Sequence, residues 1–168
     1  MYRFLQIILG LLFFLSGFGK GLDPLATANK INEYLNIFSL GFLKPLDLFF
    51  ALCVITIELV VSVLLILNIF PRLSLWISTF MLVVFTPKTL YVALKGSMQF
   101  TGCFGHLFNF TPWQAHWKNV FMDVLIIILW VVLSKLSQRQ PFSPKIRWWI
   151  LIISIIVSVV FQTVMIIA

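Results

Sequence analysis

Five apolar stretches, each long enough to cross a lipid bilayer or nearly so, constrain this chain more than any other feature of its sequence. A membrane-spanning helix needs about 20 predominantly apolar residues. Only 10% of the residues are charged, against roughly a quarter in soluble domains. The sequence therefore predicts an all-α integral membrane protein with almost no soluble domain. The expected spans are Phe4–Gly19, Asp47–Phe70, Leu73–Leu94, Lys118–Leu133 and Ile146–Ala168.

The net charge of +7 does not indicate a nucleic-acid partner, because the basic residues lie between the spans and not on one face of a folded surface. An excess of Lys and Arg in cytoplasmic loops is the usual source of such a charge in membrane proteins. The two cysteines, Cys53 and Cys103, lie in no CxxC motif and no Cys/His spacing of a zinc site. We expect no metal site.

A short amphipathic helix is predicted between the first two spans. Asp23 suits the helix cap and Pro24 the first helical position. Apolar residues then recur at helical spacing, so the segment should lie along the membrane surface. It is either a packing helix or a helix that binds a partner. Its apolar positions are Leu25, Ala28, Ile31, Leu35 and Phe38.

The distribution of Lys and Arg gives the expected orientation of this multi-pass chain. The two sides carry equal numbers, but on one side Lys88 falls inside a span and acidic residues dilute the charge. The positive-inside bias then places the N-terminus inside. The Asp23 helix and the long connection from Lys95 to Trp117 should face the exterior or periplasm.

Three ionisable residues fall within the expected spans, namely Glu58, Lys88 and Asp123. A charge at mid-bilayer costs about 2.5 to 3.5 kcal/mol, so such residues face the bundle interior and usually pair. Helical rise puts Lys88 and Asp123 at one level, which predicts an ion pair between them. Glu58 should lie deeper without a partner at its own level. The cluster either fixes helix register or forms a proton relay or a polar pocket for a quinone-like or small cationic ligand.

The connection before the fourth span is rich in glycine and aromatic residues. Cys103 stands between Gly102 and Gly105, His106 follows, and aromatic residues including Trp113 suit a membrane interface. Around these residues the chain resembles the DoxX-like superfamily, in the branch related to the methylamine utilisation protein MauE. The resemblance rests on FLSGFGKGLDPLATANKINEYL, on Glu58 in span two, on GCFG and on TPWQAHWKN. It covers roughly residues 1–135 and leaves 136–168 as a loop and an additional helix.

This resemblance implies a four-helix DoxX-like bundle in the bacterial inner membrane, to which the chain adds a fifth transmembrane helix and the interfacial helix. It also implies a non-enzymatic helper in a redox or periplasmic protein-maturation system, because MauE-like proteins are linked to amine metabolism and support production of a disulfide-rich periplasmic dehydrogenase subunit. The expected partners are membrane lipid and a membrane or periplasmic protein. No cofactor is expected, with a quinone as the alternative.

The chain departs from this branch at Thr101, where the pattern commonly has a cysteine. Cys103 is then an inert turn residue, a reactive thiol activated by His106, or half of a bridge to Cys53, since exchange needs a second sulfur. The alternative function is a quinone-linked or thiol-disulfide oxidoreductase with Cys103 as catalytic residue and Glu58 as proton carrier. A small-solute transporter around Glu58 and Lys88 is a third interpretation, although no inverted repeat is evident.

Overall fold

The chain folds into a bundle of long helices in the computed structural model, which describes residues 2–37, 41–95, 111–135 and 142–167. Five helices in this part are long and apolar enough to cross a membrane. The prediction of an all-α membrane protein is confirmed. The elements are α1 (Tyr2–Gly21), α2 (Pro24–Ile37), the 3-10 helix η1 (Gly41–Leu46), α3 (Asp47–Leu67), α4 (Pro71–Lys95), α5 (Pro112–Lys135) and α6 (Pro144–Ile167).

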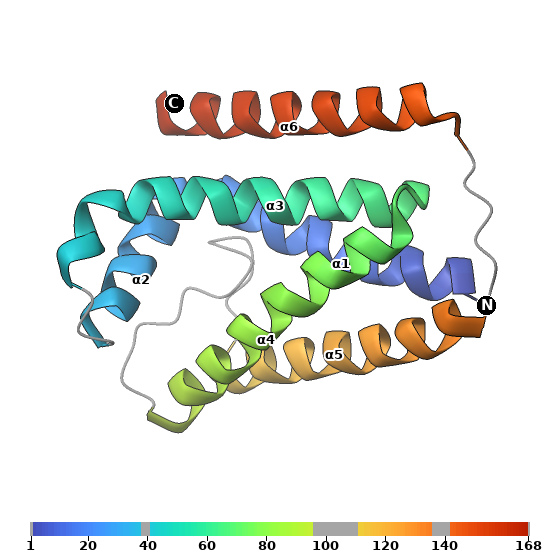
Figure 1. The fold of residues 1–168 in the computed structure, drawn as a ribbon. Helices are drawn as coiled ribbons and strands as arrows, with labels where there is room; N and C mark the ends of the chain where they lie inside the picture. The colour runs from blue at the N-terminus through green and yellow to red at the C-terminus, as the bar shows by residue number, and fades with distance from the viewer. Residues whose placement is uncertain (1, 38–40, 96–110, 136–141, 168) are drawn as a thin grey trace.

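Four helices make the core of the bundle (Figure 1). Helix α1 packs along α3 and α4 packs along α5, while α1 also contacts α5 and α3 contacts α4. The short α2 lies against the first part of α3, and α6 runs along the outer side of α3. Leucine, isoleucine, methionine and phenylalanine side chains fill the interior. The largest fully buried apolar ones include Leu9, Phe13, Leu75, Leu82, Met122 and Leu129.

Glycines on α1 allow close contact with α3. A Cβ atom at Gly10 would lie 2.8 Å from Cγ1 of Ile66, and one at Gly17 would lie 3.0 Å from Cβ of Glu58. Small residues allow such close approach of membrane helices, whose packing depends on van der Waals contact because no hydrophobic gain drives association in lipid. Gly10 and Gly17, here called the glycine seam, therefore fix the register and the distance between α1 and α3.

The amphipathic segment forms the helix α2, as predicted. The carboxylate of Asp23 accepts a hydrogen bond from the backbone N–H of Ala26 at 2.8 Å, which is the capping contact expected at a helix N-terminus. The amide of Asn32 donates to Asp47 at the start of α3 at 3.1 Å. Both contacts anchor α2 at the same end of the bundle as the last turn of α1.

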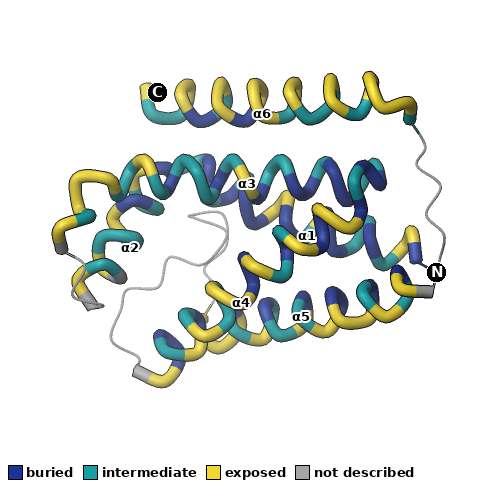
Figure 2. Tube along the Cα trace, in the orientation of Figure 1, coloured by how far each residue is buried: buried dark blue, intermediate teal, exposed yellow. Residues whose placement is uncertain are grey.

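Helix α6 lies at the edge of the bundle and exposes most of its surface (Figure 2). Its buried residues are Ser158 and Gln162, and the Gln162 amide donates a hydrogen bond to the hydroxyl of Thr56 on α3 at 2.8 Å. The rings of Phe18 and Phe161 stack with centroids 5.4 Å apart. The apolar outer face is the one expected to contact lipid, and the inner face is fixed by these few specific contacts.

The start of the fourth span was predicted wrongly, since α5 begins at Pro112 and not at Lys118. The hydroxyl of Thr111 accepts from the N–H of Gln114 at 3.4 Å, and Oε1 of Gln114 accepts from the N–H of Thr111 at 2.9 Å. This reciprocal pair is a capping box followed by Pro at the first helical position. Trp113 therefore lies in the first turn of α5, and Asp123 lies near the middle of that helix.

Candidate functional site in the bundle interior

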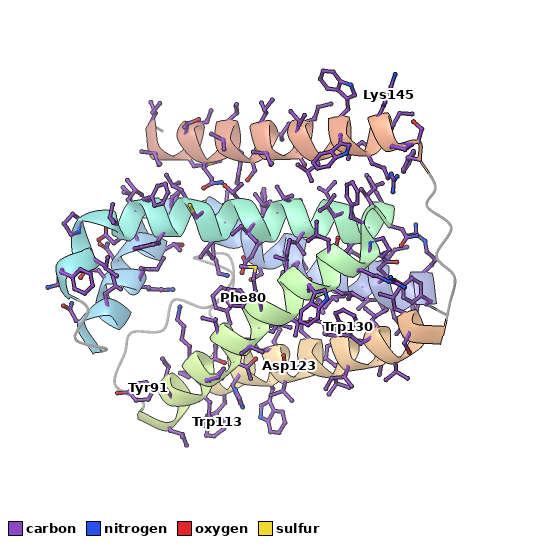
Figure 3. All side chains as sticks on the ribbon, in the orientation of Figure 1. Phe80, Tyr91, Trp113, Asp123, Trp130 and Lys145 are labelled. Carbon is purple, nitrogen blue, oxygen red and sulfur yellow. The ribbon has the colours of Figure 1, made fainter. Side chains whose placement is uncertain are left out.

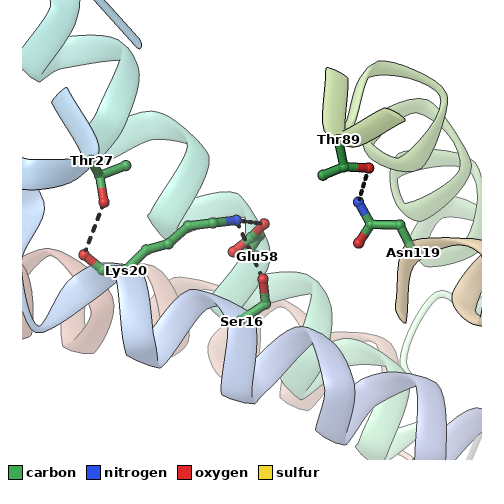
Figure 4. A network of polar contacts seen from close by, with 6 residues as sticks. All are labelled: Ser16, Lys20, Thr27, Glu58, Thr89 and Asn119. Carbon is green, nitrogen blue, oxygen red and sulfur yellow. Dashed lines mark hydrogen bonds and ion pairs between the residues drawn. The ribbon is translucent and has the colours of Figure 1, made fainter. Parts of the chain in front are cut away.

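An ion pair between Lys20 and Glu58 forms the centre of the candidate site (Figure 4). Glu58 is on α3 with 1% of its side chain exposed, and Lys20 is in the last turn of α1 with 16% exposed. The expectation that Glu58 has no partner at its own level is wrong. The first span was expected to end at Gly19, but α1 continues to Gly21. Lys20 therefore belongs to the helix, and its side chain points into the bundle toward Glu58 on α3.

The Lys20 ammonium has two further contacts. It donates to the hydroxyl of Ser16, one turn earlier on α1, at 3.3 Å. It also lies 4.6 Å from the centroid of the Phe85 ring on α4, within the range of a cation–π interaction. Three helices therefore hold this one ammonium group, which suits a charge that is kept away from lipid.

The Glu58 carboxylate is only partly engaged. Its Oε1 atom accepts from Lys20, whereas its Oε2 atom is buried and has no hydrogen-bond partner among the residues that the structure describes. Buried carboxylate oxygens are normally hydrogen-bonded, and an exception calls for an explanation. Oε2 is therefore the atom of this site that can accept a further donor.

A second polar group lies on α4 and α5, the helices across the bundle from the ion pair (Figure 4). The Asn119 amide donates to the hydroxyl of Thr89 at 3.3 Å, and Nδ1 of His116 lies 3.4 Å from the same hydroxyl oxygen. Thr89 is four residues after Phe85, so both are on one face of α4. Thr89, Asn119 and Lys20 were not singled out in the sequence. Thr89 and Asn119 could have been found as polar residues inside apolar spans.

The two other predicted members of the intramembrane cluster lie on α4 and α5. The Lys88 ammonium lies 5.5 Å from the centroid of Phe85, the ring that Lys20 also contacts. Asp123 lies on α5 where α4 passes it (Figure 3), and its carboxylate accepts a hydrogen bond from the Thr86 hydroxyl at 2.8 Å. The predicted ion pair between Lys88 and Asp123 stays a prediction.

Of the predicted external residues, the structure describes Asp23 and Trp113. Asp23 caps α2, and Trp113 is half exposed and meets the His116 ring edge-on with centroids 6.3 Å apart. Gly102, Cys103, Gly105 and His106 lie outside the described residues. Cys53, on α3, is half-buried and its thiol is free in the described part of the chain. Among the residues that the structure describes, no group of His, Cys, Asp and Glu could hold a metal ion.

Comparison with known proteins agrees with the sequence motifs. The family of the methylamine utilisation protein MauE matches residues 1–134. "Protein TlpB" of Flavobacterium psychrophilum is 31% identical over 141 residues, which are 82% of this chain and 38% of that protein. The chain thus spans less than half the length of this relative. No solved structure matches the chain. A match that covers α1 to α5 with this similarity shows that the chain, a multi-pass membrane protein, belongs to the MauE family.

Proposed function

We propose that this protein is a non-enzymatic membrane helper in a redox or periplasmic protein-maturation system and that it binds a protein partner at the end of the bundle that carries α2. The observation that carries the proposal is the family match over residues 1–134, because these residues include the three helices whose side chains contact the Lys20 ammonium, α1, α3 and α4. MauE takes its name from methylamine utilisation, and we place this chain in a related amine-linked process.

The exposed side of α2 is polar, which supports contact with a partner protein in the aqueous phase. Helix α2 packs against α3, and its exposed residues include the polar Asn29, Glu33 and Asn36. Polar side chains of this kind suit a protein surface better than acyl chains. The cap at Asp23 and the bond from Asn32 to Asp47 hold this surface in place, so that it offers a preformed contact area.

The charges support a bundle with its N-terminus in the cytoplasm of a bacterial inner membrane. Lys20 is engaged with Glu58 inside the bundle, so it no longer counts among the charges of the α2 end. In the sequence, six basic residues adjoin the opposite ends of the spans, namely Arg3, Arg72, Lys135, Arg139, Lys145 and Arg147. Lys145, labelled in Figure 3, lies at the same end of the bundle as the N-terminus, which Figure 1 marks in the same orientation. By the positive-inside bias this end is cytoplasmic, and α2 faces the periplasm.

A site-specific photo-crosslinker tests the partner. Placed at Asn29 on the exposed side of α2, it should give one dominant adduct with an exported or membrane protein in cells. The same group at Val131, an exposed apolar position on α5, is the matched control and should react with lipid. Equal adduct patterns at the two positions, together with a chain that purifies alone in several mild detergents, would refute the proposal.

The second candidate is a thiol-disulfide or quinone-linked oxidoreductase that uses Cys103 and Glu58. It is favoured by the Oε2 atom of Glu58, which has no hydrogen-bond partner in the described part of the chain and can accept a hydrogen bond from the hydroxyl of a quinol. This candidate predicts fast labelling of Cys103 by an external maleimide and loss of function in Cys103→Ser but not in Cys53→Ser. An unreactive Cys103, or an active Cys103→Ser variant, would exclude it.

A further inference from the structure

We propose that the bundle binds one anionic phospholipid at the end that carries the N-terminus, with the lipid phosphate held by Arg3, Arg72 and Arg147 around the turn between α3 and α4. The phosphate is recognised by charge and by hydrogen bonds, and no covalent bond changes. The proposal goes beyond the partner role and does not depend on it.

The first argument is the balance of charge at this end of the bundle. Arg3, Arg72 and Arg147 lie in the first turns of α1, α4 and α6, and these three helices begin at the same end (Figure 1). None of the acidic residues of the chain adjoins this end of a span in the sequence; they are Asp23, Glu33, Asp47, Glu58 and Asp123. This end therefore carries a net positive charge, which favours an anionic ligand.

The second argument is that two of the guanidinium groups are held against the same short segment, the end of α3 and the turn that follows it. Arg3 donates from Nη2 to the carbonyl oxygen of Ile66 at 3.3 Å, which engages one of the five N–H donors of an arginine. Cζ of Arg147 lies 5.2 Å from the centroid of the Phe70 ring, within the range of a cation–π interaction. A guanidinium stacked on a ring presents its N–H groups at its edge, in the geometry that binds phosphate oxygens in pairs.

The turn that supports Arg147 is fixed by the bundle. Asn68 and Phe70 both have positive φ, 57° and 47°, and this conformation is rare for a bulky side chain. The amide of Gln6, a fully buried residue on α1, donates a hydrogen bond to Oδ1 of Asn68 at 3.0 Å. The Phe70 ring is therefore held in one place, and with it the guanidinium group of Arg147.

The side chains that follow Arg147 favour a lipid over a soluble anion. Trp148 and Trp149 are both exposed, and tryptophans at the end of a span lie at the level of the lipid headgroups. The next turn of α6 exposes Ile152 and Ile153, which offer an apolar surface to acyl chains. A soluble phosphate would gain nothing from that surface, whereas a basic site between membrane helices suits the headgroup of an anionic lipid.

Native mass spectrometry of the purified protein tests the proposal, because it counts the lipids that stay bound. The probes are dioleoylphosphatidylglycerol, which is anionic, and dioleoylphosphatidylcholine, which has the same acyl chains and no net charge, added in equal amounts. The wild type should retain one molecule of the anionic lipid in preference to the neutral one, also in an excess of inorganic phosphate. Equal retention of the two lipids would overturn the proposal, and displacement of the lipid by phosphate would show a site for a soluble anion instead.

Variants separate a built site from diffuse positive charge. Arg147→Met should lower the preference for the anionic lipid about fivefold, the effect of one basic residue near an anionic surface. Lys44→Met, the matched control at an exposed lysine on η1, should leave the preference unchanged. If both variants lowered it equally, net charge alone would attract the lipid and the proposal would be wrong.

A variant that keeps every charge tests the support of Arg147. Phe70→Gly removes the ring under the guanidinium group, and glycine adopts the positive φ of this position without strain, so the turn is kept. The preference for the anionic lipid should fall, because Arg147 is no longer held in place. A Phe70→Gly protein with the preference of the wild type would overturn the proposal that the turn builds the site.

Discussion

Replacing Lys20 with Met is the perturbation that best tests how the bundle tolerates its buried charges. Met keeps much of the length of the Lys stem and removes the ammonium. The variant then loses the ion pair with Glu58, the bond to Ser16 and the contact with Phe85. Because Glu58 is 1% exposed and Lys20 16%, the pair belongs to the buried class and not to the solvent-screened surface class, whose members contribute about 0 to 1 kcal/mol.

The expected loss is about 3 to 5 kcal/mol in the free energy of unfolding, the usual effect of removing one partner of a buried pair. The double variant Lys20→Met/Glu58→Gln should recover most of it, since replacing both ions by neutral groups of similar size is often close to neutral. The two single variants and the double variant form a thermodynamic cycle whose coupling energy isolates the pair.

Unfolding in a mild detergent, monitored by the loss of helical circular dichroism, gives the free energies of unfolding of the wild type, the two single variants and the double variant. Lys44→Met, in which an exposed lysine is removed, should unfold like the wild type. If Lys20→Met were as stable as Lys44→Met, or if the double variant were no more stable than the single one, the ion pair would not be the contact that holds these two helices together.

Three further variants probe the contacts around the site. Gly17→Ala places a methyl group 3.0 Å from Cβ of Glu58. This overpacking should lower the free energy of unfolding by about 1 to 3 kcal/mol in the same assay. An unchanged midpoint would mean that α1 and α3 are not in tight contact. Gln162→Leu removes the bond to Thr56 and should cost only about 0.6 kcal/mol, the average for hydrogen bonds between membrane helices, so a large loss would contradict it. Asp23→Ala removes the cap of α2 and should cost about 0.5 to 2 kcal/mol locally, seen as faster amide exchange at the start of α2 but not in α3.

Much of the fold could be predicted from the sequence, because length and apolar composition alone identify a membrane span. The helix α2 followed from Asp23 and Pro24, and its cap is present. The start of α5 was missed although its signal was there, since Thr111 and Gln114 have the spacing of a capping box. Their aromatic neighbours had indicated an interfacial loop, and a cap outweighs such a composition signal.

The partner of Glu58 could not be predicted in the same way. Depth was counted from the ends of separate spans, which assumes that all spans begin at one level and that a lysine after the last apolar residue faces water. The close contact at Gly17 instead brings α1 against α3 with Lys20 turned inward. Such a contact depends on the register between two helices far apart in sequence, and hydropathy carries no information about that register.

The site of this chain also extends beyond the region that defines its family. The family match ends at residue 134, before α6 begins at Pro144. Yet a Cβ atom at Gly21, next to Lys20, would lie 2.6 Å from Cε1 of Phe161 on α6, and Phe18 stacks on the same ring. Helix α6 therefore restrains the last turn of α1, the turn that presents Lys20 to Glu58. In this protein the contacts of Phe161 on the fifth membrane helix therefore add to those that α1, α3 and α4 make around the ammonium.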